Sequence, residues 1–435
     1  MNPFPKDDGY RGIWFTLGQM CDYGDKYSGG LGTYTAKHVP LAVYAPQANK
    51  TFFVYGGARG GQRHLLAMAS CYDHDRHVVP CPTIVHDKGG ADDPHENPSI
   101  ALDEHGHVWI FVSGRARERP GFKYRSLEPY SIDAFEQVSE EEMTYLQPWW
   151  IEGKGFLHLF TKYTGVRELY WNTSPDGRTW SPHRKLAGIE GHYQISQRQG
   201  GRVITAFNMH PDGKPDKRTN LYFVQTHDMG RTWRTADGSP VDTPLIDIDC
   251  PALVRDFRSE GRLVYMKDIN FDPDGRPVIL VVASRDYAPG PGGDPRIWTL
   301  CQWTGEAWRF DEVTTSTHNY DMGSLYIEND GQYRIIAPTE PGPQHHGTGG
   351  EMVLWISDDR GRTWRKERDI TRNSPLNHAY ARRPVNAHPD FYAFWANGNP
   401  DEMSESRLYF MNRAGDHVWV LPSDMAGDFA EPERL

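Results

Sequence analysis

The chain has 435 residues, with 58 Asp and Glu against 47 Lys and Arg, which gives a formal net charge of -11 at pH 7. This charge argues against nucleic acid as a partner, because contact with a phosphate backbone requires an excess of basic groups. The longest aliphatic stretch, Val278 to Ala283, is far shorter than the roughly 20 residues of a membrane-spanning helix. We therefore expect neither nucleic acid nor a membrane as a partner.

The composition, with 43 Gly, 32 Pro and 12% aromatic residues, is typical of many short strands joined by tight turns. The five cysteines show no CxxC spacing, so we expect buried thiols, with a Cys71 to Cys81 disulfide as the alternative. The opening MNPFPKDDGY lacks the basic and apolar regions of a signal peptide. This predicts a cytoplasmic protein, or a periplasmic or secreted one if a leader has been trimmed.

Residues 1–31 show no repeat and are predicted to form an N-terminal arm. After them, an apolar strand, a turn rich in Asp, Gly or Asn, and a second apolar strand recur about seven times, at separations of about 45 to 75 residues. This period predicts an all-β fold, a single seven-bladed β-propeller domain over residues 1–435. The charged segment 115–142, with a helical turn at IDAFEQVSEEEM, is predicted to be an insertion between two blades.

A turn motif supports the propeller prediction. The pattern Ser/Thr-x-Asp-x-Gly-x-Thr-Trp is complete at residues 226–233 (THDMGRTW) and 357–364 (SDDRGRTW), and it is one residue shorter at 174–180 (SPDGRTW). Each copy follows a strand-like run. Gly supplies a positive φ, the Asp carboxylate accepts backbone N–H groups, and Trp packs under the turn. This Asp box predicts blade turns and indicates no activity.

Polar residues recur at a common position, just before or at the start of each predicted inner strand. Because the inner strands of a propeller all begin at the same mouth, these side chains are expected to converge there. A ring of histidines, tyrosines and basic groups suits proton transfer on an anionic sugar. The residues are His38, His95, Tyr145 with Gln147, His192 with Tyr193, Lys267 with Asp268, His318 with Tyr320 and Asp321, and His378 with Arg382 and Arg383.

Metal binding is a competing use of the histidines. His74 and His77 lie in CYDHDRH, and a second group follows closely in HDKGGADDPHENP. Imidazole and carboxylate groups of this kind can bind a structural calcium or zinc ion, although no fixed zinc spacing is present. No cofactor is expected to be required. The second group consists of His86, Asp92, Asp93 and His95.

Several blocks resemble the BNR-4 group of Asp-box propellers, over nearly the entire chain. They are DDPHENPSIALDEHGHVWIF, TYLQPWWIEGKGFLHLFTKY, NYDMGSLYIENDGQYRIIAPTEPGP and ARRPVNAHPDFYAFWANG. That group includes lyases of uronic-acid polymers, such as the ulvan lyases, and enzymes that cut rhamnose to glucuronate linkages. The resemblance therefore implies an anionic carbohydrate substrate cleaved by β-elimination.

In the ulvan lyases a histidine and a tyrosine serve as acid and base, and an arginine neutralises the uronate carboxylate. By matching motif, the resemblance implies catalytic roles for His95 and Tyr145, and Lys162 in HLFTKY stands where the family has its arginine. Lysine keeps the charge but loses the planar fork, so either Arg382 or Arg383 holds the carboxylate or the substrate differs from that of the family. His38 and His192 complete the catalytic candidates, and Lys162, Tyr193, Lys267, His318, Tyr320, Asp321, Arg382 and Arg383 are the substrate-binding candidates.

Two other functions remain open at this stage. A propeller glycoside hydrolase, related to sialidases or rhamnosidases, would need paired carboxylates, for which Asp268, Asp321 and Glu340 are the inner candidates. A carbohydrate-binding propeller without catalysis would instead use the abundant Trp and Tyr as stacking surfaces. Formation of an unsaturated product separates the lyase from both.

Overall fold

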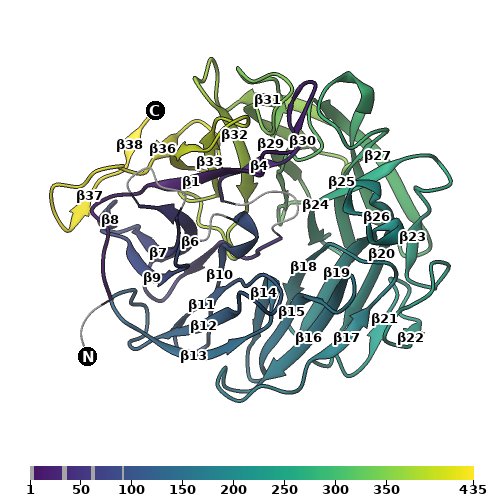
Figure 1. Ribbon diagram of the computed structural model, residues 1–435, viewed down its shortest axis with the longest axis horizontal. Helices are drawn as coiled ribbons and strands as arrows, with labels where there is room; N and C mark the ends of the chain where they lie inside the picture. The colour runs from purple at the N-terminus through teal and green to yellow at the C-terminus, as the bar shows by residue number, and fades with distance from the viewer. Residues whose placement is uncertain (1–3, 32–36, 60–63, 91–92) are drawn as a thin grey trace.

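The computed structural model describes residues 4–31, 37–59, 64–90 and 93–435. These residues form antiparallel sheets arranged in a ring (Figure 1). The inner strands lie next to one another around the ring, from β5 (Ala42–Ala45) through β10 (Pro98–Leu102), β14 (Thr144–Ile151), β18 (Gln194–Gln199) and β24 (Leu263–Phe271) to β28 (Ser324–Ile327). The prediction of an all-β propeller is confirmed.

Six sheets are built from strands that follow one another closely in sequence. The first three contain β10 (Pro98–Leu102), β11 (Val108–Val112), β12 (Gly121–Ser126) and β13 (Phe135–Glu141); β14 (Thr144–Ile151), β15 (Gly155–Tyr163), β16 (Arg167–Ser174) and β17 (Arg184–Ala187); and β18 (Gln194–Gln199), β19 (Arg202–Met209), β20 (Thr219–Thr226), β21 (Trp233–Arg234), β22 (Pro240–Val241) and β23 (Leu253–Arg255).

The other three contain β24 (Leu263–Phe271), β25 (Pro277–Ser284), β26 (Arg296–Trp303) and β27 (Trp308–Ser316); β28 (Ser324–Ile327), β29 (Tyr333–Glu340), β30 (Glu351–Ser357) and β31 (Arg365–Asp369); and β32 (Asn377–Arg382), β33 (Ala393–Gly398), β35 (Leu408–Met411), β36 (Val418–Val420) and β38 (Glu433–Arg434). Short 3-10 helices occur at η1 (Pro94–Glu96), η2 (Pro211–Gly213), η3 (Pro215–Lys217) and η4 (Pro291–Gly293).

The remaining large sheet joins the two ends of the chain. It has seven strands, β1 (Gly12–Thr16), β4 (Ser28–Gly29), β5 (Ala42–Ala45), β6 (Lys50–Ala58), β7 (Leu65–Asp73), β9 (Thr83–Asp87) and β34 (Ser404–Ser406). Two small ribbons accompany it, β2 (Met20–Cys21) with β3 (Gly24–Asp25), and β8 (Val79–Pro80) with β37 (Phe429–Ala430). The predicted N-terminal arm therefore supplies β1, which pairs with β34 from near the other end of the chain.

The predicted count of seven blades is not confirmed. Six sheets have the regular form, and the seven-stranded sheet differs from them because it combines β5, β6, β7 and β9 with strands from both ends of the chain. Figure 1 shows this sheet beside the C-terminal strands. A pairing of Val43 with Val385 also links it to the segment that follows β32, the first strand of the last regular sheet.

The prediction that residues 115–142 form an insertion between two blades is wrong. These residues contain β12 and β13, the two outer strands of their sheet, and no helical turn forms. β13 pairs along its length with β12 and leaves its charged side chains partly exposed at the edge of the sheet. The run of glutamates is compatible with a solvated helix as well as with an edge strand. Its pairing with β12 decides that it forms a strand.

The Asp boxes form the predicted turns, between the third and fourth strands of three sheets. Gly230 has φ of 76° and donates its N–H to Thr226 Oγ1 at 2.9 Å, and Thr232 donates its N–H to the Asp228 carboxylate at 2.9 Å. The copies that begin at Ser174 and Ser357 make the corresponding carboxylate contacts. These turns are structural, as predicted.

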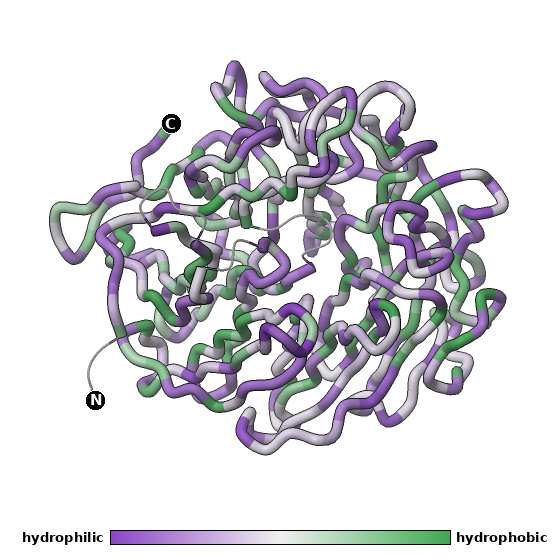
Figure 2. Tube along the Cα trace, viewed as in Figure 1, coloured by the Kyte–Doolittle hydropathy of each residue, from purple (hydrophilic) through white to green (hydrophobic). Residues whose placement is uncertain are grey.

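Strands inside a sheet are buried on both faces because neighbouring sheets pack against them. β20 and β25 have every residue buried, which accounts for the apolar runs LYFV and VILVVA at their centres. Figure 2 shows the hydrophobic stretches along the strands and hydrophilic loops at the rim. All five cysteines are free thiols, and the alternative Cys71 to Cys81 disulfide does not form; the expected burial holds only for Cys71 and Cys301. No helix among the described residues is long and apolar enough to cross a membrane.

Candidate active site

A pocket with an empty volume of about 380 Å³ opens at the mouth where the inner strands begin. Its wall includes His95, Tyr193 and Tyr320, three members of the polar ring predicted from the sequence. Four cationic side chains share this pocket with one acidic side chain, Asp216, so its wall is strongly basic. The lining residues are Leu17, Gln19, Lys26, Tyr27, His95, Arg115, Arg167, Tyr193, Pro215, Asp216, Arg218 and Tyr320.

His95 lies in η1, immediately before β10, and Asp93 fixes its orientation. The Asp93 carboxylate accepts the His95 backbone N–H at 3.0 Å and also contacts Nδ1 of the ring. We assign the ring proton to Nδ1, from which it is donated to the Asp93 carboxylate. Nε2 then carries the lone pair and accepts a hydrogen bond from the Tyr27 hydroxyl at 3.1 Å. Burial lowers the pKa of His95 to about 4 although Asp93 opposes the shift. At neutral pH the ring is an uncharged base.

The turn that holds His95 is anchored by a second acidic residue. Glu96 is fully buried and forms ion pairs with Lys88 at 2.7 Å and with Arg119 at 2.5 Å. Arg119 also contacts the second oxygen of Asp93 at 3.2 Å. These contacts place Asp93 and His95 as one rigid unit beside the pocket.

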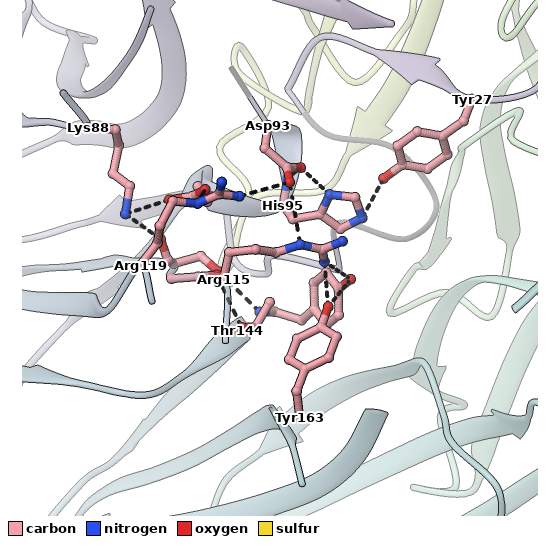
Figure 3. A network of polar contacts seen from close by, with 12 residues as sticks. Tyr27, Lys88, Asp93, His95, Arg115, Arg119, Thr144 and Tyr163 are labelled. Carbon is pink, nitrogen blue, oxygen red and sulfur yellow. Dashed lines mark hydrogen bonds and ion pairs between the residues drawn. The ribbon is translucent and has the colours of Figure 1, made fainter. Parts of the chain in front are cut away.

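Arg115 connects the histidine to a pair of tyrosines. Its guanidinium lies 3.4 Å from Asp93, donates to the Tyr145 hydroxyl at 3.1 Å and also contacts the Tyr163 hydroxyl. The two hydroxyls are 3.1 Å apart. Figure 3 shows Arg115 between His95 and Tyr163, with Tyr27 beyond His95. An acid–base group therefore lies on each side of one cation.

Tyr145 reaches this position through an irregular backbone. It has φ of 57°, in a bulge of β14 where the pairing with β15 shifts between Thr144 and Gln147. A bulge of this kind re-aims a side chain, and a positive φ in a bulky residue is a strain that the surrounding structure must hold. Burial raises the pKa of Tyr145 well above its usual value, although Arg115 acts in the opposite direction. The phenol therefore keeps its proton. Tyr145 is almost fully buried and is not itself among the lining residues; it adjoins the pocket through Arg115 and through the ring of His95, whose centroid is 5.5 Å away.

Two more arginines, Arg167 and Arg218, line the pocket. Arg218 donates to the Tyr320 hydroxyl at 2.9 Å and lies over the rings of Tyr193 and Tyr265, at 5.1 and 4.5 Å from their centroids. Arg167 lies 5.8 Å from the centroid of Tyr193. Planar guanidinium groups on aromatic rings present their N–H edges for a carboxylate.

The other two catalytic candidates, His38 and His192, have structural contacts. His192 is fully buried, with Nδ1 bound to the Asn208 carbonyl at 2.7 Å and Nε2 accepting the Ile189 N–H at 2.9 Å. Both ring nitrogens are therefore engaged by the backbone. His38 lies behind the pocket, where its Nε2 contacts the His95 carbonyl at 3.0 Å and its ring lies 6.2 Å from that of Tyr145.

Lys267, Asp321 and His318 lie around the channel and not among the residues that line the pocket. Lys267 is fully buried and donates to the Asn319 carbonyl at 2.7 Å. Asp321 accepts the N–H groups of His318 and Gly349 at 3.0 and 2.7 Å, and burial raises its pKa to about 6.

Arg382 and Arg383 lie near the end of β32, away from the mouth where that strand begins. Arg382 donates to the Lys267 carbonyl and Arg383 to the Leu325 carbonyl, each at 3.0 Å. Arg383 is also 3.7 Å from Asp268, whose carboxylate accepts the Leu325 N–H. The remaining ring members also have protein partners: Gln147 donates to the Gln194 carbonyl, and His378 contacts Ser374 and Trp395.

Lys162, the match to the family arginine, does not line the pocket. Its ammonium group forms an ion pair with Glu142 at 3.4 Å and lies over the ring of Tyr170. Side chains alternate along β15, so Tyr163 points to the site and Lys162 points away from it. The arginines at the pocket are Arg115, Arg167 and Arg218.

Those arginines, together with Tyr27 and Tyr163, are absent from the sequence prediction. A topological signal could have found most of them. The second strand of each sheet returns to the mouth, so the loop between the second and third strands also lies there. Arg115 follows β11, Arg167 begins β16, and Arg218 ends the loop between β19 and β20.

Comparisons with known proteins agree with this fold. A curated relative named ulvan lyase, from Alteromonas sp. (strain LOR), is 20% identical over 369 residues, which cover 76% of this chain and 74% of the relative. A second, named Ulvan Lyase-PL25, from Pseudoalteromonas sp. (strain PLSV), is also 20% identical over 369 residues, covering 76% of this chain and 73% of its own length.

Among solved structures, one described as polysaccharide lyase PL25-Ulvanlyase superimposes with a TM-score of 0.75 at 17% identity, covering 94% of this chain and 96% of the other. The polysaccharide lyase Uly1 superimposes with a TM-score of 0.63 at 11% identity, covering 95% and 99%. The family model described as BNR repeat-containing family member matches residues 68–316, more than half of the chain. The chain therefore belongs to the BNR repeat-containing family.

Proposed function

We propose that this protein is a polysaccharide lyase that cleaves a glycosidic bond to a uronic acid by β-elimination. The observation that carries the proposal is the arrangement around Arg115, which has an uncharged histidine on one side and a protonated tyrosine on the other. The relatives named ulvan lyase support the same reaction class. One solved relative is described with bound -[GlcA(1-4)Rha3S]-, so glucuronate linked to rhamnose is the first substrate to test.

The carboxylate of the uronate binds to the arginines of the pocket. β-Elimination needs this charge neutralised, because the C5 proton becomes acidic only when the adjacent carboxylate can accept electron density. Arg115, Arg167 and Arg218 all line the pocket, and each offers a planar set of N–H donors. We assign to them the role that the resemblance gave to Lys162.

His95 is the base and Tyr145 the acid in this proposal. His95 Nε2 takes the C5 proton, directly or through the Tyr27 hydroxyl that it already binds at 3.1 Å. The electron pair of the C5–H bond forms the C4–C5 double bond, and the C4–O bond breaks. The departing oxygen takes the Tyr145 proton, and the resulting phenolate stays beside Arg115 at 3.1 Å.

The test is an incubation of the purified protein with ulvan, rhamnose-glucuronate oligosaccharides and other uronate polymers, following the ultraviolet absorbance of the unsaturated product. We expect absorbance to rise with at least one of them and not with the His95→Gln variant. New reducing ends without a double bond would indicate a hydrolase and overturn the proposal. Binding without any cleavage would favour a non-catalytic propeller.

We also propose that the seven-stranded sheet acts as a seventh blade that closes the ring. Its strands β5, β6, β7 and β9 pair antiparallel in order, as in the regular sheets, and β5 lies beside β10. An experimental structure that showed β5 outside the channel wall would contradict this count.

A further inference from the structure

The residues His74, His388 and Asp390 form a cluster at the end of the ring opposite the pocket. Each of them offers one ligand atom, and these three atoms lie within 4.8 Å of one another. Among the described residues, this cluster is the one group of at least three such side chains that could bind a metal ion. The grouping predicted from the sequence is different. There, His77 contacts Tyr72 and His86 contacts Tyr124, while Asp93 and His95 belong to the pocket and Asp92 lies outside the described residues.

The cluster lies where the first and last sheets meet. His74 follows the end of β7, and His388 and Asp390 lie in the loop between β32 and β33. The first and third strands of each propeller sheet run away from the mouth. The loops that follow β7 and β32 therefore both lie at the far end of the ring. The rings of His74 and His388 are in contact, with their centroids 3.8 Å apart.

His74 has one ring nitrogen without a hydrogen-bond partner among the described residues. The side chain is 6% exposed, Nε2 contacts Thr51 Oγ1 at 2.8 Å, and Nδ1 is buried without a hydrogen bond within the described residues. With its proton on Nε2 and donated to Thr51, the ring offers a lone pair at Nδ1, which is the outer-shell arrangement usual for a metal-binding histidine.

His388 and Asp390 have the geometry of neighbouring ligands. The lone pair of His388 Nδ1 accepts the Asp390 N–H at 3.1 Å, and Nδ1 is 3.8 Å from the Asp390 carboxylate, so a metal ion bound through Nδ1 would replace this hydrogen bond. Two ligands of a tetrahedral zinc ion are about 3.3 Å apart, given metal–ligand bonds of about 2.0 Å. A small movement of these partly exposed side chains brings both within bonding distance.

We propose that His74, His388 and Asp390 bind a zinc ion, with water as the fourth ligand, and that this ion ties the last sheet to the first. Two imidazoles with one carboxylate are borderline-soft donors that suit zinc, whereas calcium and magnesium require oxygen ligands. A ligand that binds only the folded ring stabilises it by mass action.

The test uses metal-free full-length protein titrated with ZnCl₂, with bound zinc measured by atomic spectroscopy after dialysis and unfolding measured by calorimetry. We expect one equivalent of zinc and a melting temperature that rises with zinc concentration. His388→Ala and Asp390→Asn should each weaken zinc binding by more than about tenfold, since outer-shell changes alone reach 10- to 100-fold. Both side chains are partly exposed, at 22% and 51%, so these variants fold.

The matched control is His417→Ala, which removes a partly exposed histidine paired with Asp416 at 2.7 Å. It should bind zinc as the parent does. Equal zinc binding by the parent and His388→Ala would overturn the proposal, and so would stabilisation by calcium but not zinc. Because the readouts are binding and melting temperature, the result is independent of the proposed lyase activity.

Discussion

Replacing Asp93 by Asn tests the assignment of His95 as the base. The Asp93 carboxylate accepts from Nδ1 of His95 and lies 3.4 and 3.2 Å from Arg115 and Arg119. An amide oxygen turned to Nδ1 leaves the NH₂ group facing two guanidinium groups. The reverse orientation places an N–H donor against Nδ1, which moves the ring proton to Nε2 and removes the lone pair needed for catalysis.

The expected loss of kcat follows because each orientation of the new amide is unfavourable. Removing the carboxylate that holds a catalytic histidine in its reactive tautomer costs up to about 10⁴-fold in kcat, and general-base catalysis itself contributes about 10² to 10⁴. We therefore expect Asp93→Asn to lower kcat by about 10² to 10⁴, or about 2.7 to 5.4 kcal/mol of activation free energy. The assay is the initial rate of absorbance increase with saturating uronate polymer.

The matched control is Asp133→Asn, which removes a surface carboxylate paired with Lys6 at 2.7 Å. It should keep the parental rate. If Asp93→Asn has the circular dichroism spectrum and melting curve of the parent and its kcat is within threefold of the parental value, then Asp93 does not set the tautomer of His95, and the reasoning is refuted.

Three further predictions concern the acid, the displaced lysine and acid stability. Tyr145→Phe should lower kcat by about 10² to 10⁴ with little change in KM, and an unchanged kcat would assign the acid elsewhere. Lys162→Ala should leave kcat/KM within about twofold, because Lys162 pairs with Glu142 outside the pocket; a loss above tenfold would return it to the site. Burial lowers the pKa of His95, His192 and His378 to about 4, below the value of about 6.5 in an unfolded chain, so the unfolded state binds protons first as the pH falls. The contribution of these histidines to the free energy of unfolding is complete above about pH 6.5 and is lost as the pH falls towards 4. At pH 5 the loss is about 2 kcal/mol for each histidine. Equal urea midpoints at pH 7 and pH 5 would contradict this prediction.

The repeating strands and Asp boxes were sufficient to predict the propeller. Periodicity and turn residues are local properties, so Gly230 and Asp228 form the predicted turn without help from distant residues. The segment 115–142 was misread because a charged edge strand and a solvated helix have similar sequences. Only its pairing with the neighbouring strand decides between them.

The sequence by itself determined that His95, Tyr193 and Tyr320 meet at one mouth, because their common position relative to the inner strands requires it. Tertiary structure decided which cations accompany them. Arg115 and Arg218 lie in loops between second and third strands, and Arg167 directly follows such a loop; the lengths of these loops vary from sheet to sheet, so no fixed spacing marks the three arginines. The bulge that turns Tyr145 toward Arg115, and the alternation that turns Lys162 away, depend on strand register, which pairing between strands sets.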